Sequence, residues 1–199
     1  MSHHKKASFV LLEGVDLSGK SSVISRLVKK YEHWRHQHYT ITGSNKILEV
    51  AREIEKDGSE WIGHLYAKAL EYDISQFQWP EVNTIQDSTI LLRSLAYHAA
   101  ARYQQVVHEL ETIALKHPKF TSSYVFTASI EVRKERLKER IQSGSKKVTV
   151  NDLKVIRDPE FFMRMEHALV DYAQTFFGAV VIDTSNMSLD EVANSIFLH

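Results

Sequence analysis

The sequence predicts one α/β domain with a five-stranded parallel sheet flanked by helices. Five short runs rich in apolar, aromatic or β-branched residues are separated by segments whose apolar residues recur at helical spacing. Strands that alternate with helices in this way pair in parallel, and the helices cover the sheet. The chain of 199 residues has the length of one domain, and its 43% hydrophobic residues suffice for a core.

The first two strands are expected on either side of a helix. Phe9–Leu12 is a continuous apolar run bounded by turn residues, which is typical of a strand buried on both faces. Apolar residues from Ile24 to Tyr31 recur at helical spacing and predict the helix. The aromatic and β-branched segment Tyr39–Thr42 predicts the second strand.

The middle of the chain is expected to be mainly helical. Apolar spacing predicts helices over 47–56 and 61–77, which are separated near Gly58. Val82–Gln86 predicts the third strand, and one long helix is expected over about 91–116.

The last third of the chain continues the alternation. Ser123–Thr127 predicts the fourth strand, and a charged helix is expected over 131–142. Asp158-Pro159 has the N-cap and first-turn residues of a further helix. Ala179–Ile182 predicts the fifth strand, and the capping box Ser188–Glu191 opens the last helix.

Charge and composition exclude several classes of function. Lys and Arg together number 25, as do Asp and Glu, so there is no net charge to hold a nucleic acid polymer or an anionic membrane. The absence of Cys excludes disulfides, zinc–cysteine sites and a cysteine nucleophile. No apolar stretch approaches the roughly 20 residues of a membrane span, so we expect a soluble cytoplasmic protein. The histidines show no metal-ligand spacing, and we interpret His36 and His38 as surface residues.

A glycine-rich loop after the first strand carries the most specific motif. Gly14-Val-Asp-Leu-Ser-Gly-Lys-Ser21 fits the phosphate-loop pattern G-x-x-x-x-G-K-S/T, with a strand before it and an amphipathic helix after it. Glycines let backbone N–H groups converge on a phosphate, and the helix presents its N-terminus to the same anion. Lys20 can bridge the β- and γ-phosphates of ATP, and the Ser21 hydroxyl can reach Mg²⁺. The alternative is a glycine-rich turn that fits the pattern by chance.

Asp87 is the second candidate site residue. It follows the third predicted strand, and ligands bind beyond the carboxyl ends of the strands in an open parallel sheet. There it can hold Mg²⁺, directly or through water, or act as a base. Its alternative role is the N-cap of the next helix.

Basic residues gather in the helix 131–142 and in the segment after it. Pairing with glutamates four residues away on a solvated face explains most of them. Phosphoryl transfer also needs mobile cations, and a basic helix followed by Ser143-Gly-Ser-Lys-Lys147 is typical of a lid, which we expect at about 141–158. The basic residues are Arg133, Lys134, Arg136, Lys138, Arg140, Lys146, Lys147, Lys154 and Arg157.

The phosphate loop resembles that of the thymidylate kinases, whose pattern is F-x-x-x-E-G-x-D-G-x-G-K-S/T-T. Phe9, Glu13, Gly14 and Asp16 stand at the matching positions, and an Asp inside the loop is a trait of that family. Weaker matches follow in order along nearly the whole chain, at Asp87 with Ser94–Tyr97, 131–140, 162–172 and 180–185. The resemblance implies a P-loop kinase fold, with a flexible start over 1–7 and a single kinase domain over 8–199. It also implies a homodimer, for which the helix 91–116 could supply the face.

The resemblance further implies roles for individual residues. Those expected at the ATP phosphates and Mg²⁺ are Gly14, Ser18, Gly19, Lys20, Ser21 and Ser22. Asp16 would face the acceptor, Asp87 would support the metal, and Arg136 would lie by the adenine. Arg140 would open the lid and reach the transferring phosphoryl group.

Three departures from the family concern the acceptor side. The family meets the acceptor phosphate with arginines from three segments, and bidentate contacts of Arg cannot be replaced by Ser or Gly. The corresponding segments here are Thr42-Gly-Ser-Asn-Lys46, Asp87-Ser88 and Ala69-Leu70. Lys46, Lys68 and Arg93 are candidates to compensate, although each could equally be a solvated residue. We assign Arg93, with Asp16, to the acceptor site.

We therefore expect an enzyme, a phosphotransferase that uses ATP and Mg²⁺ with Lys20, Asp87 and Arg140 as catalytic residues. Its acceptor would be a nucleotide, a nucleoside or a similar small molecule. The departures leave two alternatives, an orthodox dTMP kinase and a non-catalytic ATP-binding protein.

Overall fold

A five-stranded parallel sheet organises the computed structural model, which describes residues 6–54, 60–144 and 148–196. The strand order is β2-β3-β1-β4-β5 and every neighbouring pair is parallel, which confirms the predicted fold class. The strands are β1 (Phe9–Glu13), β2 (Arg35–His38), β3 (Thr84–Asp87), β4 (Ser122–Thr127) and β5 (Val180–Asp183). β1 and β3 are buried along their whole length, because helices cover both faces of the centre of the sheet.

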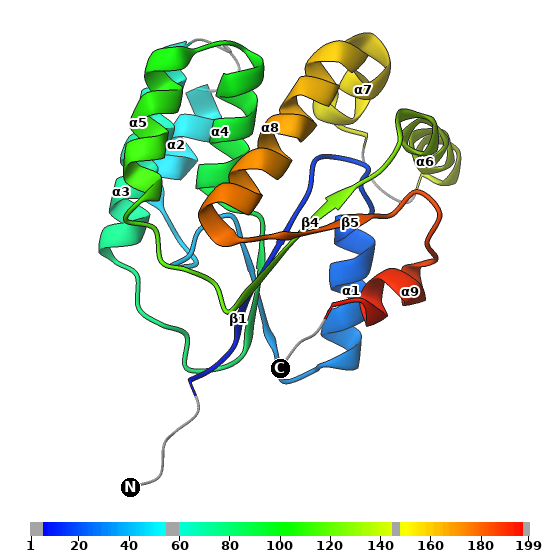
Figure 1. Ribbon diagram of the computed structural model, residues 1–199, viewed down its shortest axis with the longest axis horizontal. Coiled ribbons are helices and arrows are strands. Elements are labelled where there is room, and N and C mark those ends of the chain that lie inside the picture. The colour runs from blue at the N-terminus through cyan, green and yellow to red at the C-terminus, as the bar shows by residue number, and fades with distance from the viewer. Residues whose placement is uncertain (1–5, 55–59, 145–147, 197–199) are drawn as a thin grey trace, which may run out of the picture.

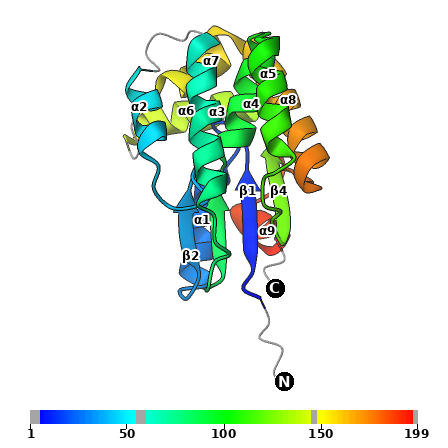
Figure 2. The same cartoon turned by 90° about the vertical axis from the view of Figure 1, so that its left-hand side faces the viewer.

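Helices form a layer on each face of the sheet (Figures 1 and 2). The helices of the described residues are α1 (Lys20–Lys30), α2 (Lys46–Ile54), α3 (Glu60–Ser75), α4 (Ile90–Ala100), α5 (Gln104–Ala114), α6 (Ile130–Ser143), α7 (Val150–Arg157), α8 (Pro159–Phe177) and α9 (Leu189–Asn194). α1 and α9 share a core with Val10 and Leu12 of β1, whereas α4 and α8 share one with Leu11. Alternate residues of β1 therefore serve opposite layers. α6 and α7 lie beyond the carboxyl end of β4 (Figure 1).

Two elements predicted from the sequence are wrong. The second strand is Arg35–His38, and Tyr39, which was expected to lie in it, has a φ of +59° and ends it. An edge strand needs little apolar content, and only Gln37 of β2 is buried. The expected long helix is two helices, α4 and α5, separated at Arg102, whose φ of +64° is left-handed and incompatible with a continuous helix.

Parts of the expected lid and of the flexible start lie outside the described residues, at 145–147 and 1–5. α6 runs to Ser143 and ends on Gly144, and α7 occupies most of the second half of the expected lid segment. Near the start, the Ala7 carbonyl accepts a hydrogen bond from Trp79 Nε1 at 2.9 Å. The domain bounds and the lid stay predictions. None of the helices in the described ranges combines the length and the apolar character that crossing a membrane requires.

Candidate active site

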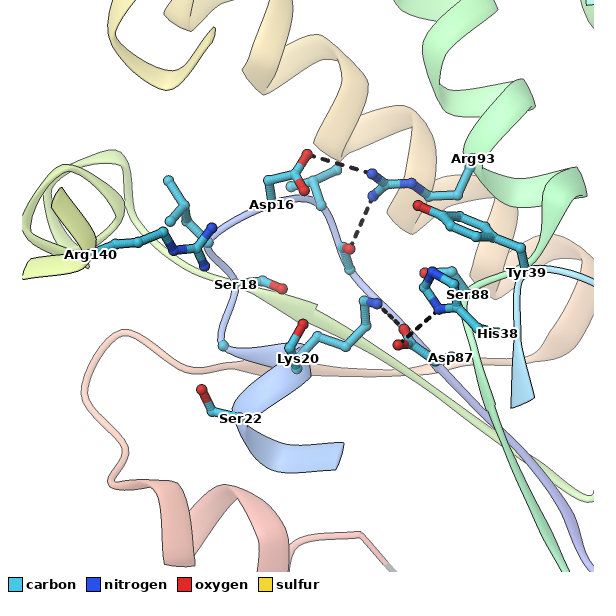
Figure 3. A pocket seen from close by; sticks show the side chains of 15 residues that line it. Asp16, Ser18, Lys20, Ser22, His38, Tyr39, Asp87, Ser88, Arg93 and Arg140 are labelled. Atoms are coloured by element: carbon cyan, nitrogen blue, oxygen red, sulfur yellow. Dashed lines mark hydrogen bonds and ion pairs between the residues drawn. The ribbon is translucent and has the colours of Figure 1, made fainter. Parts of the chain in front are cut away.

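A cavity of about 230 Å³ lies at the carboxyl ends of β1 and β3. Its lining residues come from the loop after β1, the start of α1, the ends of β2 and β3, α4 and α6 (Figure 3). They are Gly14, Val15, Asp16, Leu17, Ser18, Gly19, Lys20, Ser21, Ser22, His38, Tyr39, Asp87, Ser88, Arg93 and Arg140. Every predicted site residue except Arg136 is in this set, so segments far apart in the sequence meet at one place.

The phosphate loop is shaped by two glycines. A Cβ on Gly14 would lie 2.9 Å from the Phe126 carbonyl oxygen, so only glycine lets the loop cross β4 this closely. Gly19 has a φ of +88° and is the N-cap of α1, where it supplies no side-chain cap. The amide N–H groups at the start of α1 therefore keep the capacity to bind an anion in the cavity.

The Ser18 hydroxyl lacks a partner inside this loop. Ser18 is 1% exposed, and its Oγ is one of the buried side-chain atoms of the described residues that make no hydrogen bond. A buried polar group left unpaired costs about 1–3 kcal/mol. Because Ser18 lines the cavity among backbone amides, a phosphate oxygen is the ligand whose chemistry suits both groups.

Lys20 and Asp87 face each other across the cavity floor. Lys20 Nζ donates to Asp87 Oδ1, and the Asp87 side chain is 9% exposed (Figure 3). Burial alone would raise the pKa of Asp87, but hydrogen bonding from His38 and the positive charge of Lys20 outweigh it and hold the pKa well below its ordinary value. The carboxylate is therefore ionised at neutral pH.

Asp87 is not the N-cap that the alternative reading of the sequence allowed. The N-cap of α4 is Thr89, whose hydroxyl accepts a 3.0 Å hydrogen bond from the Leu92 amide. Asp87 is the last residue of β3, and its carboxylate is turned to the cavity. This excludes the capping role for Asp87, and its carboxylate is therefore available to interact with a ligand in the cavity.

His38 is a site residue that sequence analysis missed. Its Nδ1 lies 3.0 Å from Asp87 Oδ2, and His36 Nε2 lies 3.5 Å from the same oxygen. Both imidazoles are partly exposed, as expected of surface residues, but His38 also lines the cavity. The available signal was their spacing of two, which places them on one face of a strand. This spacing indicates a contact with Asp87 only when β2 is known to pair with β3, because that pairing places His38 beside Asp87.

Arg93 and Asp16 form the far end of the cavity, on the predicted acceptor side. Arg93 NH1 donates to the Gly14 carbonyl at 3.1 Å, and NH2 lies 3.5 Å from Asp16 Oδ2. Burial alone would lower the pKa of Arg93, but the nearby Asp16, Tyr39 and Glu13 raise it above its ordinary value. Of the three basic residues that were candidates to compensate, Lys46 and Lys68 are exposed and outside the cavity lining, and only Arg93 lines it.

Three arginines of α6 approach the loop in different ways. Arg140 lines the cavity and donates to Asp152 of α7 at 2.6 Å. Arg136 donates to the Leu17 carbonyl at 2.9 Å and to the carbonyl of Thr184 at 2.9 Å, so its guanidinium lies against the outside of the loop. Arg133 was expected on a solvated face and is instead fully buried, with NH1 2.6 Å from the Asp16 carbonyl. The three arginines lie on one helix, as their spacing predicts, but they face the phosphate loop and not the solvent.

Backbone strain gathers at the same cavity. Four non-glycine residues in the described ranges have positive φ, and Leu17, Tyr39 and Ser88 among them line the cavity. Such conformations cost about 1–3 kcal/mol each and concentrate at functional sites. Tyr39 and Ser88 lie outside the phosphate-loop motif, so their strain marks this cavity independently of the motif.

No family model and no curated protein matches the sequence. Solved structures do match it. Thymidylate kinase from Candida albicans is similar with a TM-score of 0.68 and 15% identity, covering 96% of this chain and 89% of that one. Thymidylate kinase from Ehrlichia chaffeensis has a TM-score of 0.58 and 13% identity, covering 96% of both chains. Deoxyadenosine kinase from M. mycoides, solved with bound dATP, has a TM-score of 0.64 and 14% identity, covering 94% of this chain and 96% of that one.

These similarities extend over nearly the whole chain, at identities that show the fold alone. They agree with the strand order and with the position of the phosphate loop between β1 and α1. The chain thus has the α/β P-loop kinase fold shared by thymidylate kinases and deoxyadenosine kinase.

Proposed function

We propose that the protein is an ATP-dependent phosphotransferase whose acceptor is a nucleoside, a nucleotide or a similar small molecule. The observation that carries the proposal is the convergence, in one cavity, of the glycine-shaped loop, the unpartnered Ser18 hydroxyl and Lys20. In this arrangement the loop amides and Ser18 would bind phosphate oxygens, and Lys20 would leave Asp87 for the β- and γ-phosphates. The acceptor oxygen would bond to the γ-phosphorus as the bond from that phosphorus to its bridging oxygen breaks. ADP would leave with that oxygen, and the proton of a hydroxyl acceptor would pass to water.

Ser21 and Asp87 are the residues that would hold Mg²⁺. Hydroxyl and carboxylate oxygens are the ligands this ion prefers, and both side chains line the cavity beside Lys20. Bound Mg²⁺ would neutralise charge on the phosphates. The depressed pKa of Asp87 keeps its carboxylate ionised, which favours a role in supporting the metal over that of a general base.

The acceptor side favours a hydroxyl group with little negative charge near it. The cavity-lining arginines and lysine already pair with carboxylates: Lys20 with Asp87, Arg93 with Asp16, and Arg140 with Asp152. A phosphate on the acceptor would have to draw Arg93 away from Asp16 and would then face that free carboxylate. Each lost hydrogen bond between charged groups is worth about 1.5–3 kcal/mol, so we expect dTMP to be a poor substrate.

A phosphotransfer screen tests the proposal. ADP release and product formation are measured with MgATP and a panel containing dTMP, thymidine, other nucleosides and common hydroxylated metabolites, with Lys20→Ala as the inactive control. Transfer to an uncharged nucleoside would support the proposal. A kcat/KM for dTMP of about 10⁴ M⁻¹s⁻¹ or more would refute the inference about the acceptor side. ATP binding without transfer to any member of the panel would favour the non-catalytic alternative. The homodimer also stays a prediction, which the molar mass in solution would test.

A further inference from the structure

Asp87 has partners on both of its carboxylate oxygens, and they come from opposite sides of the cavity. Lys20 Nζ, at the start of α1, contacts Oδ1, and His38 Nδ1, at the end of β2, lies 3.0 Å from Oδ2 (Figure 3). Only Lys20 belongs to the phosphate loop. The function of the second partner is not explained by the binding of ATP phosphates.

The backbone holds His38 in this place firmly. His38 is in register with Asp87 in the parallel pair of β2 and β3. The next residue, Tyr39, donates its amide to the Asp87 carbonyl at 3.1 Å, and its own carbonyl accepts from the Ile90 amide at 3.2 Å. Thr40 N donates to the His38 carbonyl at 2.8 Å, which closes a tight turn around the left-handed Tyr39. A strained turn that is tied to the end of β3 and to the start of α4 keeps the imidazole beside the carboxylate.

The two partners differ in what nucleotide binding would do to them. The phosphates of ATP would attract Lys20, because phosphate oxygens compete with Asp87 Oδ1 for the same ammonium group. Asp87, whose side chain is 9% exposed, would then keep only its imidazole contacts, with His38 Nδ1 at 3.0 Å and His36 Nε2 at 3.5 Å from Oδ2. A buried carboxylate without a donor is costly and free to rotate. The nearer of the two donors is His38 Nδ1, which can donate whether the imidazole is neutral with its proton on Nδ1 or fully protonated.

We propose that His38 is a positioning residue, whose Nδ1–H holds Asp87 Oδ2 so that the carboxylate keeps its orientation when Lys20 turns to the phosphates. Its effect on catalysis rests on the proposed function, whereas the contact itself does not. His36 does not share this role, because its Nε2 is 3.5 Å from Oδ2 and its side chain is not among those lining the cavity.

Three substitutions of His38 separate a positioning role from a merely structural one. His38→Ala removes the donor. His38→Asn restores an N–H on the atom bonded to Cγ, in the position of Nδ1, and His38→Gln places its amide one carbon further out, toward the position of Nε2. His36→Ala controls for the loss of an imidazole from the same face of β2. Each variant is assayed for Mg·ATP affinity and for kcat, with the best acceptor or with water as acceptor.

We expect His38→Ala to lower kcat about 10–100-fold, as loss of a group that orients a metal-side ligand does. Mg·ATP affinity should change much less than kcat. His38→Asn should recover most of the activity, His38→Gln should not, and His36→Ala should have a smaller effect than His38→Ala. Equal activities of the Ala and Asn variants, or wild-type kcat in His38→Ala, would overturn the proposal while leaving the phosphotransferase intact.

A measurement on the ligand-free protein tests the contact between His38 and Asp87 even if the protein does not use ATP. Long-range ¹H–¹⁵N spectra should show a proton on His38 Nδ1, and its signal should shift in Asp87→Ala. An unprotonated Nδ1, or a signal indifferent to that substitution, refutes the proposal. Conversely, a wild-type protein that shows this bond but binds no Mg·ATP would refute the proposed function alone.

Discussion

Arg133 is a fully buried cation that joins three parts of the molecule. It is 0% exposed, and its guanidinium donates to the Ala128 carbonyl at 2.8 Å, the Asp16 carbonyl at 2.6 Å and Glu166 Oε2 at 2.5 Å. α6 is thereby attached both to α8 and to the phosphate loop. Burial raises the pKa of Glu166 above its ordinary value, and the charge of Arg133 opposes this shift. The ionised form of Glu166 is therefore stabilised by its contact with Arg133.

Arg133→Met should therefore destabilise the fold strongly. The substitution takes the guanidinium away from two carbonyls and from the largely buried Glu166 carboxylate, and breaking a buried ion pair from one side costs about 3–5 kcal/mol. That is a large part of the roughly 5–15 kcal/mol by which a domain of this kind is stable. Urea unfolding followed by circular dichroism measures the change, at constant m-value.

The double variant Arg133→Met/Glu166→Leu separates charge from position. Replacing a buried pair by apolar residues is often neutral, so most of the lost stability should return. In both variants the Asp16 carbonyl of the phosphate loop lacks its donor. The affinity for Mg·ATP should therefore be reduced in the single variant and should remain reduced in the double variant, although the double variant is stable. A loss of less than about 1 kcal/mol in Arg133→Met, the range of surface pairs, would show that the arginine is solvated after all. Additive effects of the two substitutions would equally refute the coupling.

Three further substitutions test the site and the core. Lys20→Ala should abolish ATP turnover with the fold retained, because the side chain serves charge at the cavity; turnover in the variant would refute the phosphate-loop assignment. Arg140→Ala should lower kcat more than it raises the KM for ATP, since a cation that reached the transferring phosphoryl group would act mainly on the transition state; a pure KM effect would place Arg140 in ground-state binding. His117→Phe should flatten the acid side of the stability profile, as measured by urea unfolding at several pH values. Burial lowers the pKa of His117 from 6.5 to about 4, so the folded state favours the neutral imidazole. Because the unfolded state takes up a proton below pH 6.5 and the folded state only below about 4, the free energy of unfolding should fall by about 3 kcal/mol between pH 6.5 and 4. An unchanged profile in the variant would contradict this.

The sequence by itself determined the features that depend on neighbouring residues. The phosphate loop is contained within Gly14–Ser21, and its glycines, lysine and serine act through backbone geometry and charge over a few positions. The apolar run at β1 and the N-cap at Asp158 are local in the same sense, and the structure has both where the pattern predicts them. The strand–helix alternation then constrained the sheet to be parallel, so the fold class followed as well.

Tertiary structure alone decided which distant residues meet. The position of β2 depends on its pairing with β3, which overrides the β-propensity of Tyr39–Thr42 and places His38 beside Asp87. The packing of α6 against the loop buries Arg133, although its surrounding charges are typical of a solvated helix. In each case a contact between segments that are far apart in the sequence supplies the free energy that decides the structure. Local patterns carry no information about that contact until the register of the strands and the packing of the helices are known.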